Sequence, residues 1–85
     1  MEIALAHFYF HLRADGELRT DDEGQDLPDL SAARREAEQA ALELLAEAIR
    51  AGKERVPEGL VIADEAGRAL DTVLLAAVLP KFLKK

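Results

Sequence analysis

Apolar and polar residues alternate at the start of the chain. Between residues 3 and 13 the even positions are apolar, and the odd positions from His7 onward carry polar groups. This period of two predicts a β-strand whose Phe8, Phe10 and Leu12 face a core. The opposite side of the same strand would then carry the polar groups.

A turn and a returning strand are expected next. The stretch RADGEL predicts a β-hairpin over residues 3–21. A three-residue loop over residues 14–16 would place Arg13 opposite Glu17, a favourable cross-strand pair. The acidic stretch DDEGQDLPDL that follows is predicted to be a solvated turn.

The middle of the chain has a helical composition. The segment SAARREAEQAALELLAEAIRA contains no glycine or proline, which predicts an α-helix over residues 31–51 that ends at Gly52. Asp29 or Ser31 can cap its N-terminus, and Ser31 is the expected cap because its hydroxyl can accept from open backbone donors. The main apolar stripe is made of small residues that allow close packing on a sheet, namely Ala33, Ala37, Ala40, Ala41, Leu44 and Ala48.

The apolar arc of this helix widens toward its end, where it takes in Leu42, Leu45 and Ile49. One face of a sheet cannot cover an arc of that width. Either the apolar C-terminal segment, residues 76–85, folds over it, or a second subunit does.

A second hairpin follows a short linker. The stretch GLVIADEAGRALDTVLL predicts two strands over residues 59–75 around a loop at residues 65–67. The expected opposite pairs are Asp64 with Arg68, and Ile62 with Leu70. The order of strand, strand, helix, strand, strand then predicts a single α+β domain over residues 1–85, with a four-stranded antiparallel sheet and the helix on one face.

Net charge excludes some partners. The chain has 17 acidic and 11 basic residues, a formal net charge of −6, and only three phenylalanines and one tyrosine. Nucleic acid is therefore not expected as a ligand, whereas a basic protein partner is electrostatically favoured.

No apolar run approaches the roughly 18 residues of a membrane helix. Glu2 and the two histidines also argue against a secretory signal.

Cysteine is absent, so the chain has neither disulfides nor zinc–thiolate sites, and the cytoplasm is the expected location.

His7 and His11 would share a metal on a helix, but on a strand they lie about 13 Å apart at about 3.3 Å per residue. Bonds of about 2 Å cannot reach one zinc ion from both. With no activated nucleophile and no phosphate loop either, we expect no catalytic residues, no cofactor and no enzymatic activity.

The motifs FYFHLRADGE, DEGQDLPDLSAARREA and VIADEAGRALDTV resemble a family of small bacterial proteins known as domain of unknown function 6894. The resemblance extends over roughly residues 7–79. The matching positions are His11, Arg13, and residues 22–24, 27–30 and 64–68. The resemblance implies a fold and a bacterial, cytoplasmic setting, and it implies no activity. A looser likeness, in hairpin order and helix entry, is to acidic antitoxin domains that bind a small toxin.

The strand face turned away from the helix is the predicted interaction surface, with His7, Tyr9 and His11 in a row. The second hairpin is expected to add Val61, Ala63 and Val73 beside them. The predicted function is a non-enzymatic binding or regulatory module that self-associates as a homodimer. The alternatives are an antitoxin-like acidic partner of a basic protein, and a metal-dependent site involving His11. The candidate partner-binding residues are His7, Tyr9, His11, Arg19, Leu42, Leu45, Ile49, Val61 and Val73.

Overall fold

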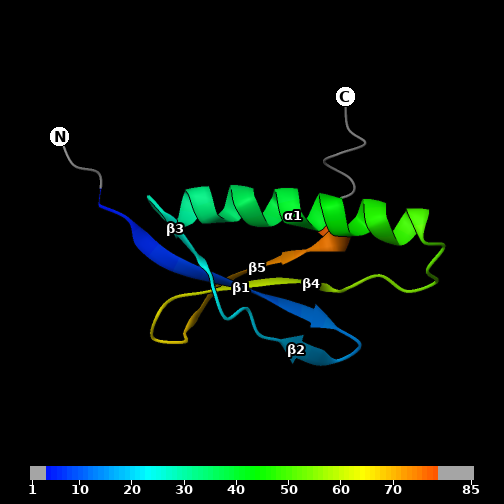
Figure 1. The fold of residues 1–85 in the computed structure, drawn as a ribbon, viewed down its shortest axis with the longest axis horizontal. Coiled ribbons are helices and arrows are strands. Elements are labelled where there is room, and N and C mark those ends of the chain that lie inside the picture. The colour runs from blue at the N-terminus through cyan, green and yellow to red at the C-terminus, as the bar shows by residue number, and fades with distance from the viewer. Residues whose placement is uncertain (1–3, 79–85) are drawn as a thin grey trace.

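A computed structural model describes residues 4–78 and shows an antiparallel sheet with one long helix across it (Figure 1). The predicted α+β class is confirmed. The elements are β1 (Ala6–Ala14), β2 (Glu17–Arg19), β3 (Gln25–Leu27), α1 (Leu30–Arg50), β4 (Gly59–Ala63) and β5 (Ala69–Leu74). Residues 75–78 form a helical turn directly after β5.

The sheet contains one strand more than predicted. Its order is β2-β1-β4-β5, and β3 also pairs with β1. The long strand β1 therefore pairs with β3 through residues 6–8 and with β2 through residues 12–14. The extra strand is formed by the second half of the acidic segment, which was expected to be only a turn.

The first hairpin has a tighter turn than predicted. Asp15 and Gly16 both have positive φ, 54° and 74°, as in a two-residue type I′ turn. Ala14 consequently pairs with Glu17, and Arg13 pairs with Leu18. The predicted pairing of Arg13 with Glu17 was wrong by one residue, because the Asp-Gly pair needs no third loop residue.

The second hairpin follows the prediction at its tip. The Asp64 N–H donates to the Arg68 carbonyl at 3.0 Å, around a loop that ends at Gly67 with φ of 84°. A bulge between Ile62 and Ala63 then shifts the register. Ile62 lies opposite Asp71 and not opposite Leu70, because β5 accommodates one additional residue there.

Helix α1 is capped by Asp29 and not by Ser31. Asp29 is extended, with φ of −161°, and its carboxylate accepts from the Ala32 N–H at 2.8 Å. Ser31 already lies inside the first turn, so the predicted cap was wrong. At the other end Gly52, with φ of 67°, closes the helix as predicted, in a Schellman motif.

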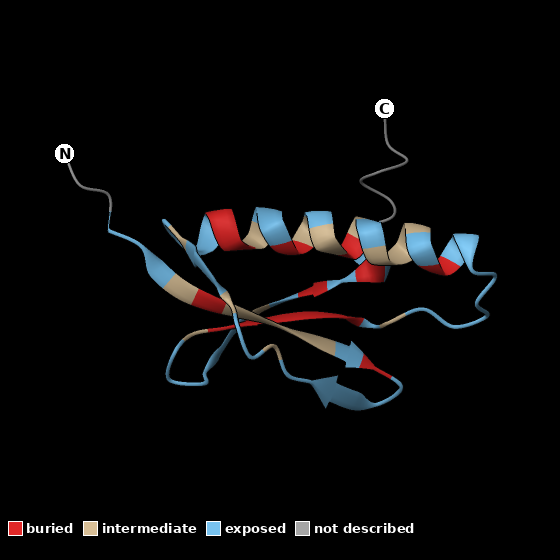
Figure 2. Ribbon diagram, viewed as in Figure 1, coloured by how far each residue is buried: buried red, intermediate tan, exposed pale blue. Residues whose placement is uncertain are grey.

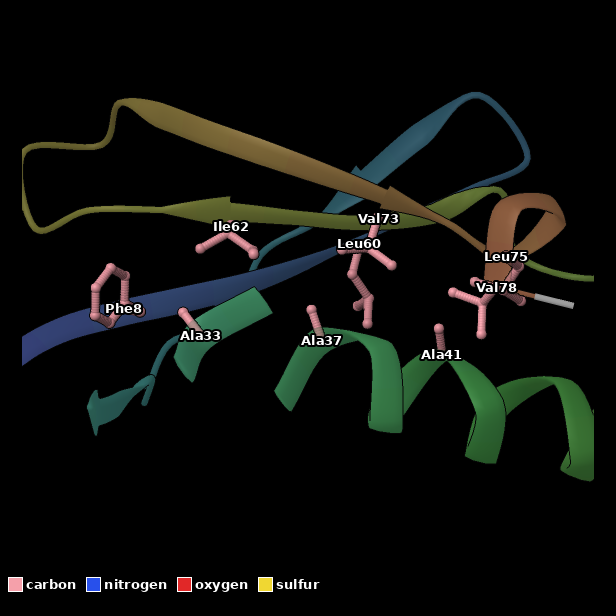
Figure 3. Close-up of a cluster of buried hydrophobic side chains, with 9 residues drawn as sticks. All are labelled: Phe8, Ala33, Ala37, Ala41, Leu60, Ile62, Val73, Leu75 and Val78. Carbon is pink, nitrogen blue, oxygen red and sulfur yellow. The ribbon is translucent and has the colours of Figure 1, made fainter. Parts of the chain in front are cut away.

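The core lies between the sheet and a stripe of alanines on α1 (Figure 3). Ile62 is fully buried, and Phe8, Leu60 and Val73 point toward the helix beside it. The alanines of the predicted stripe that lie in this cluster are Ala33, Ala37 and Ala41. Their small size lets the sheet side chains fill the space between the two layers.

The chain after β5 joins the same core. Leu75 and Val78 are buried next to the second half of α1, where Leu42 and Leu45 pack partly buried against the cluster. Part of the wide apolar arc of the helix is thus covered by the start of the predicted C-terminal segment. The rest of that segment, residues 79–85, lies outside the described residues. On the side of α1 turned away from the sheet, Figure 2 shows mostly exposed and half-buried residues.

Candidate functional site

Three aromatic rings follow one another along the face of β1 that is turned away from α1. His7 and Tyr9 meet edge to face with ring centroids 5.0 Å apart, and Tyr9 stacks on His11 at 6.2 Å. On the neighbouring strand Val61 lies opposite His11, and Ala63 lies opposite Tyr9. Both are almost fully buried, so small apolar side chains lie beside the rings on the neighbouring strand.

Val73 does not belong to this face. It pairs with Leu60 and lies in the core against α1, only 3% exposed. The predicted placement of Val73 beside the histidines was wrong, since side chains alternate along β5 and its neighbours Thr72 and Leu74 point the other way.

His7 holds the acidic segment against β1. Its Nδ1 lies 2.6 Å from Asp26 Oδ1, and its Nε2 lies 2.7 Å from the Glu23 carbonyl oxygen. Both partners are acceptors, so the two hydrogen bonds form together only when both ring nitrogens carry a proton, that is, in the imidazolium form. The hydrogen bond to Asp26 and then that to Glu23 raise the pKa of His7, and the charge of Glu65 adds to this.

His11 makes the opposite kind of contact. Its Nδ1 accepts from the Asp21 N–H at 3.0 Å, so this nitrogen carries no proton. The carboxylate of Asp21 in turn accepts from the Phe10, Glu23 and Gly24 N–H groups at 3.1, 3.1 and 3.2 Å. Partial burial works against ionisation of Asp21, but these backbone donors outweigh it and lower its pKa.

Gly24 completes this arrangement. Its φ is +69°, and a Cβ at this position would lie 2.6 Å from His7 Nε2 and 2.6 Å from the Phe8 carbonyl. Only glycine fits there. We call His7, Asp21, Glu23, Gly24 and Asp26 the acidic latch, because together they hold the segment between β2 and β3 on the central strand.

Sequence reasoning missed the latch. The sequence predicts a solvated turn for Asp21, Gly24 and Asp26, and its pattern does not connect them with the histidines. The nearest signal was the run DDEG, in which a glycine directly follows the acidic residues. That run marks a turn but does not show which strand the turn contacts.

No group of three or more His, Cys, Asp or Glu side chains in residues 4–78 is arranged to hold a metal ion. His11 engages Asp21 through Nδ1, and His7 uses both ring nitrogens on the latch.

The other candidate residues lie away from the rings. Arg19 lines a cavity of about 290 Å³ between the β1–β2 turn, the second half of α1 and the linker after it. Leu45 lines an adjacent apolar cavity of about 350 Å³ on the other side of Val56 and Pro57. Ile49 is 69% exposed, and Leu42 is partly buried. The nine candidates therefore do not form one surface.

Strand β5 forms one edge of the sheet. Asp71 on this strand binds Arg34 of α1 through Oδ2, and its Oδ1 accepts from the Thr72 N–H at 2.8 Å. The Thr72 N–H and then Arg34 lower the pKa of Asp71. At the tip of the hairpin the Arg68 N–H is the main cause that lowers the pKa of Asp64. Asp64 and Asp71, the carboxylates near this edge, thus each bind a backbone N–H and an arginine side chain.

Comparisons with known proteins give one match. The family model described as a domain of unknown function, DUF6894, matches residues 7–76. No curated protein and no solved structure matches the chain. Within residues 4–78 no helix has the length and apolar character needed to cross a membrane.

Proposed function

We propose that this chain, which belongs to the family of the domain of unknown function DUF6894, is a non-enzymatic binding module that associates with a second copy of itself. The observation that carries the proposal is the β5 edge. β5 is six residues long, and within residues 4–78 its outer side has no strand partner. Unpaired edge strands of this length are templates for pairing with another chain.

The backbone groups of β5 point alternately toward β4 and away from the sheet. The Leu75 N–H donates to the Glu58 carbonyl, toward β4. Because the direction alternates in an antiparallel ladder, Leu74 and Thr72 direct their backbone groups outward. The Thr72 N–H is already bonded to Asp71. The Leu74 carbonyl directly precedes the helical turn of residues 75–78 and accepts its first hydrogen bond. The Leu74 N–H and the Thr72 carbonyl are left for a partner.

The side chains of β5 also favour pairing with another chain. Leu70 and Leu74 are large apolar residues that are 39% and 48% exposed. The sequence of the strand, ALDTVL, contains neither lysine nor proline, the residues that commonly protect an edge. Antiparallel pairing of two β5 strands would bury these leucines in a sheet continuous through both copies.

A non-enzymatic role is supported by the contacts of the titratable residues in β1 and in the acidic segment. His7 and His11 each bond to groups of the acidic segment, and Asp21 is surrounded by backbone donors. These side chains hold the fold, which is a sufficient reason for their presence.

Sedimentation equilibrium over about 10 to 500 μM tests the self-association. The wild-type chain should form dimers in this range, and Leu74→Lys should raise the dissociation constant at least about tenfold by placing a charge on the edge. Leu18→Lys is the matched control, since Leu18 is also 48% exposed but lies on β2. A monomeric wild-type chain at the highest concentration, or equal effects of the two variants, would contradict the proposal.

A basic protein is the second candidate partner, because the same edge can accept a foreign strand and the net charge is −6. A complex with the product of a neighbouring reading frame, weakened by salt, would support this candidate. A bacterial, cytoplasmic setting is part of the proposal, and the absence of cysteine is compatible with it.

A further inference from the structure

We propose that the cavity of about 290 Å³ beside Arg19 binds a small molecule with an apolar body and a single carboxylate. We call this cavity the hollow. It lies between the β1–β2 turn, the second half of α1 and the linker between α1 and β4, and the inference does not rest on self-association.

Part of the lining of the hollow is apolar. Leu12 from β1, Leu44 and Ala48 from α1, and Val56 from the linker line it. At about 30 Å³ for the liquid volume of one water molecule, the cavity holds roughly ten non-hydrogen atoms. This is at the lower end of the size range of ligand sites and fits a short alkyl chain or one ring.

Three cationic side chains belong to the same lining. Arg19, Lys53 and Arg55 line the hollow, and none of them forms a salt bridge or side-chain hydrogen bond within residues 4–78. Arg34 and Arg68, by contrast, are each paired with an aspartate. In a chain with a net charge of −6, unpaired cations from strand β2 and from the linker after α1 therefore meet at one partly apolar cavity.

The charge of the site indicates a monoanion. Asp15 and Glu47 also line the hollow, so three cationic and two acidic side chains leave one positive charge. One carboxylate balances that charge, whereas a phosphate dianion would meet repulsion from Asp15 and Glu47. Arginine is well suited to a carboxylate, because its guanidinium can donate two parallel hydrogen bonds.

The walls of the hollow are fixed to each other. The Gly16 N–H in the β1–β2 turn donates to Glu58 Oε1 at 3.2 Å, and the Glu58 N–H donates to the Arg13 carbonyl at 2.8 Å. The turn is thus tied to the linker, and the Gly52 cap sets where the linker leaves α1. A preformed site loses little conformational entropy on binding.

Titration of the full chain with octanoate, followed by two-dimensional NMR of the backbone amides, tests the proposal. Octanoate has ten non-hydrogen atoms, in line with the volume. Shifts are expected at Leu44, Ala48 and Val56, with octan-1-ol binding at least about tenfold more weakly and acetate more weakly still. Octan-1-ol that binds as tightly as octanoate, shifts scattered over the chain, or no shifts up to about 10 mM octanoate would each overturn it.

Charge variants sharpen the test. Arg19→Gln and Arg55→Gln should each weaken octanoate binding about fivefold and leave octan-1-ol binding unchanged. Arg50→Gln is the matched control, because Arg50 is an exposed arginine at the end of α1 that does not line the hollow. If Arg50→Gln weakens octanoate binding as much as the other two variants, the attraction comes from the whole surface and the proposed site is wrong.

Discussion

The acidic latch and the hollow lie at opposite ends of strand β1 and use their charged groups in opposite ways. In the latch, His7 binds the Asp26 side chain and the Glu23 carbonyl, and the Asp21 carboxylate accepts from three backbone N–H groups. In the hollow, Arg19, Lys53 and Arg55 have no such partner within residues 4–78. The residues whose types most suggest catalytic or metal-binding chemistry in the sequence thus stabilise the fold. The charges left for a ligand belong to ordinary basic residues in strand β2 and in the linker after α1.

The largest expected effect is in the latch. Gly24→Ala should destabilise the protein by about 3 kcal/mol, because the new methyl group meets His7 Nε2 and the Phe8 carbonyl at 2.6 Å and forces a left-handed residue. Gly16→Ala, beside the hollow, is the control. Gly16 also has positive φ but nothing within 4 Å of the added carbon, so we expect a loss of only about 1 kcal/mol. Urea unfolding measures both, and equal losses would show that backbone conformation alone matters.

Asp21→Ala should cost about 2 kcal/mol, since it removes the acceptor of three backbone donors and leaves the part-buried Phe10 N–H without a partner. Its neighbour Asp22 is exposed, and Asp22→Ala should change the free energy of unfolding by less than about 0.5 kcal/mol. The same unfolding measurement compares the two variants. A cost for Asp22→Ala similar to that of Asp21→Ala would mean that the net charge of the segment, and not the latch, stabilises the fold.

Much of the fold follows from patterns in the sequence. The period-two pattern of β1 placed Phe8, Phe10 and Leu12 on the core side, and the alanine stripe placed one face of α1 on the sheet. These patterns repeat over many residues, so a local error does not change them. Single-residue details were less predictable: the turn at Asp15, the cap at Asp29 and the bulge at Ile62 each depend on competing local geometries of similar free energy.

The two sites were less predictable than the fold. The sequence separates His7 from Asp26 by 19 positions and Arg19 from Arg55 by 36, and no periodic pattern shows that either pair shares a region. The strand register brings His7 and Asp26 together, and the path of the linker after α1 brings Arg55 to the cavity that Arg19 also lines. The row of His7, Tyr9 and His11 was predictable because it lies within a single strand.

The charge of His7 gives the latch a pH dependence. Contacts with Asp26 and the Glu23 carbonyl raise the pKa of His7 above about 6.5, its usual value in an unfolded chain. The stabilising contribution is therefore fully present below about pH 6.5 and is lost as the pH rises through the higher folded-state pKa. The free energy of unfolding of the wild-type chain should exceed that of His7→Gln by more at about pH 5.5 than at about pH 8.5.

The Asp26→Asn variant shows whether Asp26 is the main cause of this shift. It should lower the pKa of His7, measured from the ring proton shifts by NMR, and move the loss of stability to lower pH. The hollow contains no histidine among its lining residues. Arg55→Gln should therefore leave the titration of His7 unchanged, and an altered titration would mean that the two ends of β1 are coupled.

The smallest effect is expected in the hollow itself. Arg19→Gln and Arg55→Gln should each change the free energy of unfolding by less than about 0.5 kcal/mol, because neither side chain has a salt bridge within residues 4–78. Arg34→Gln, which breaks the contact with Asp71, should cost more in the same urea experiment. If Arg55→Gln is as costly as Arg34→Gln, Arg55 is already engaged by Asp15 or Glu47. The hollow would then hold paired charges like the latch, and its cations would not be available to a carboxylate.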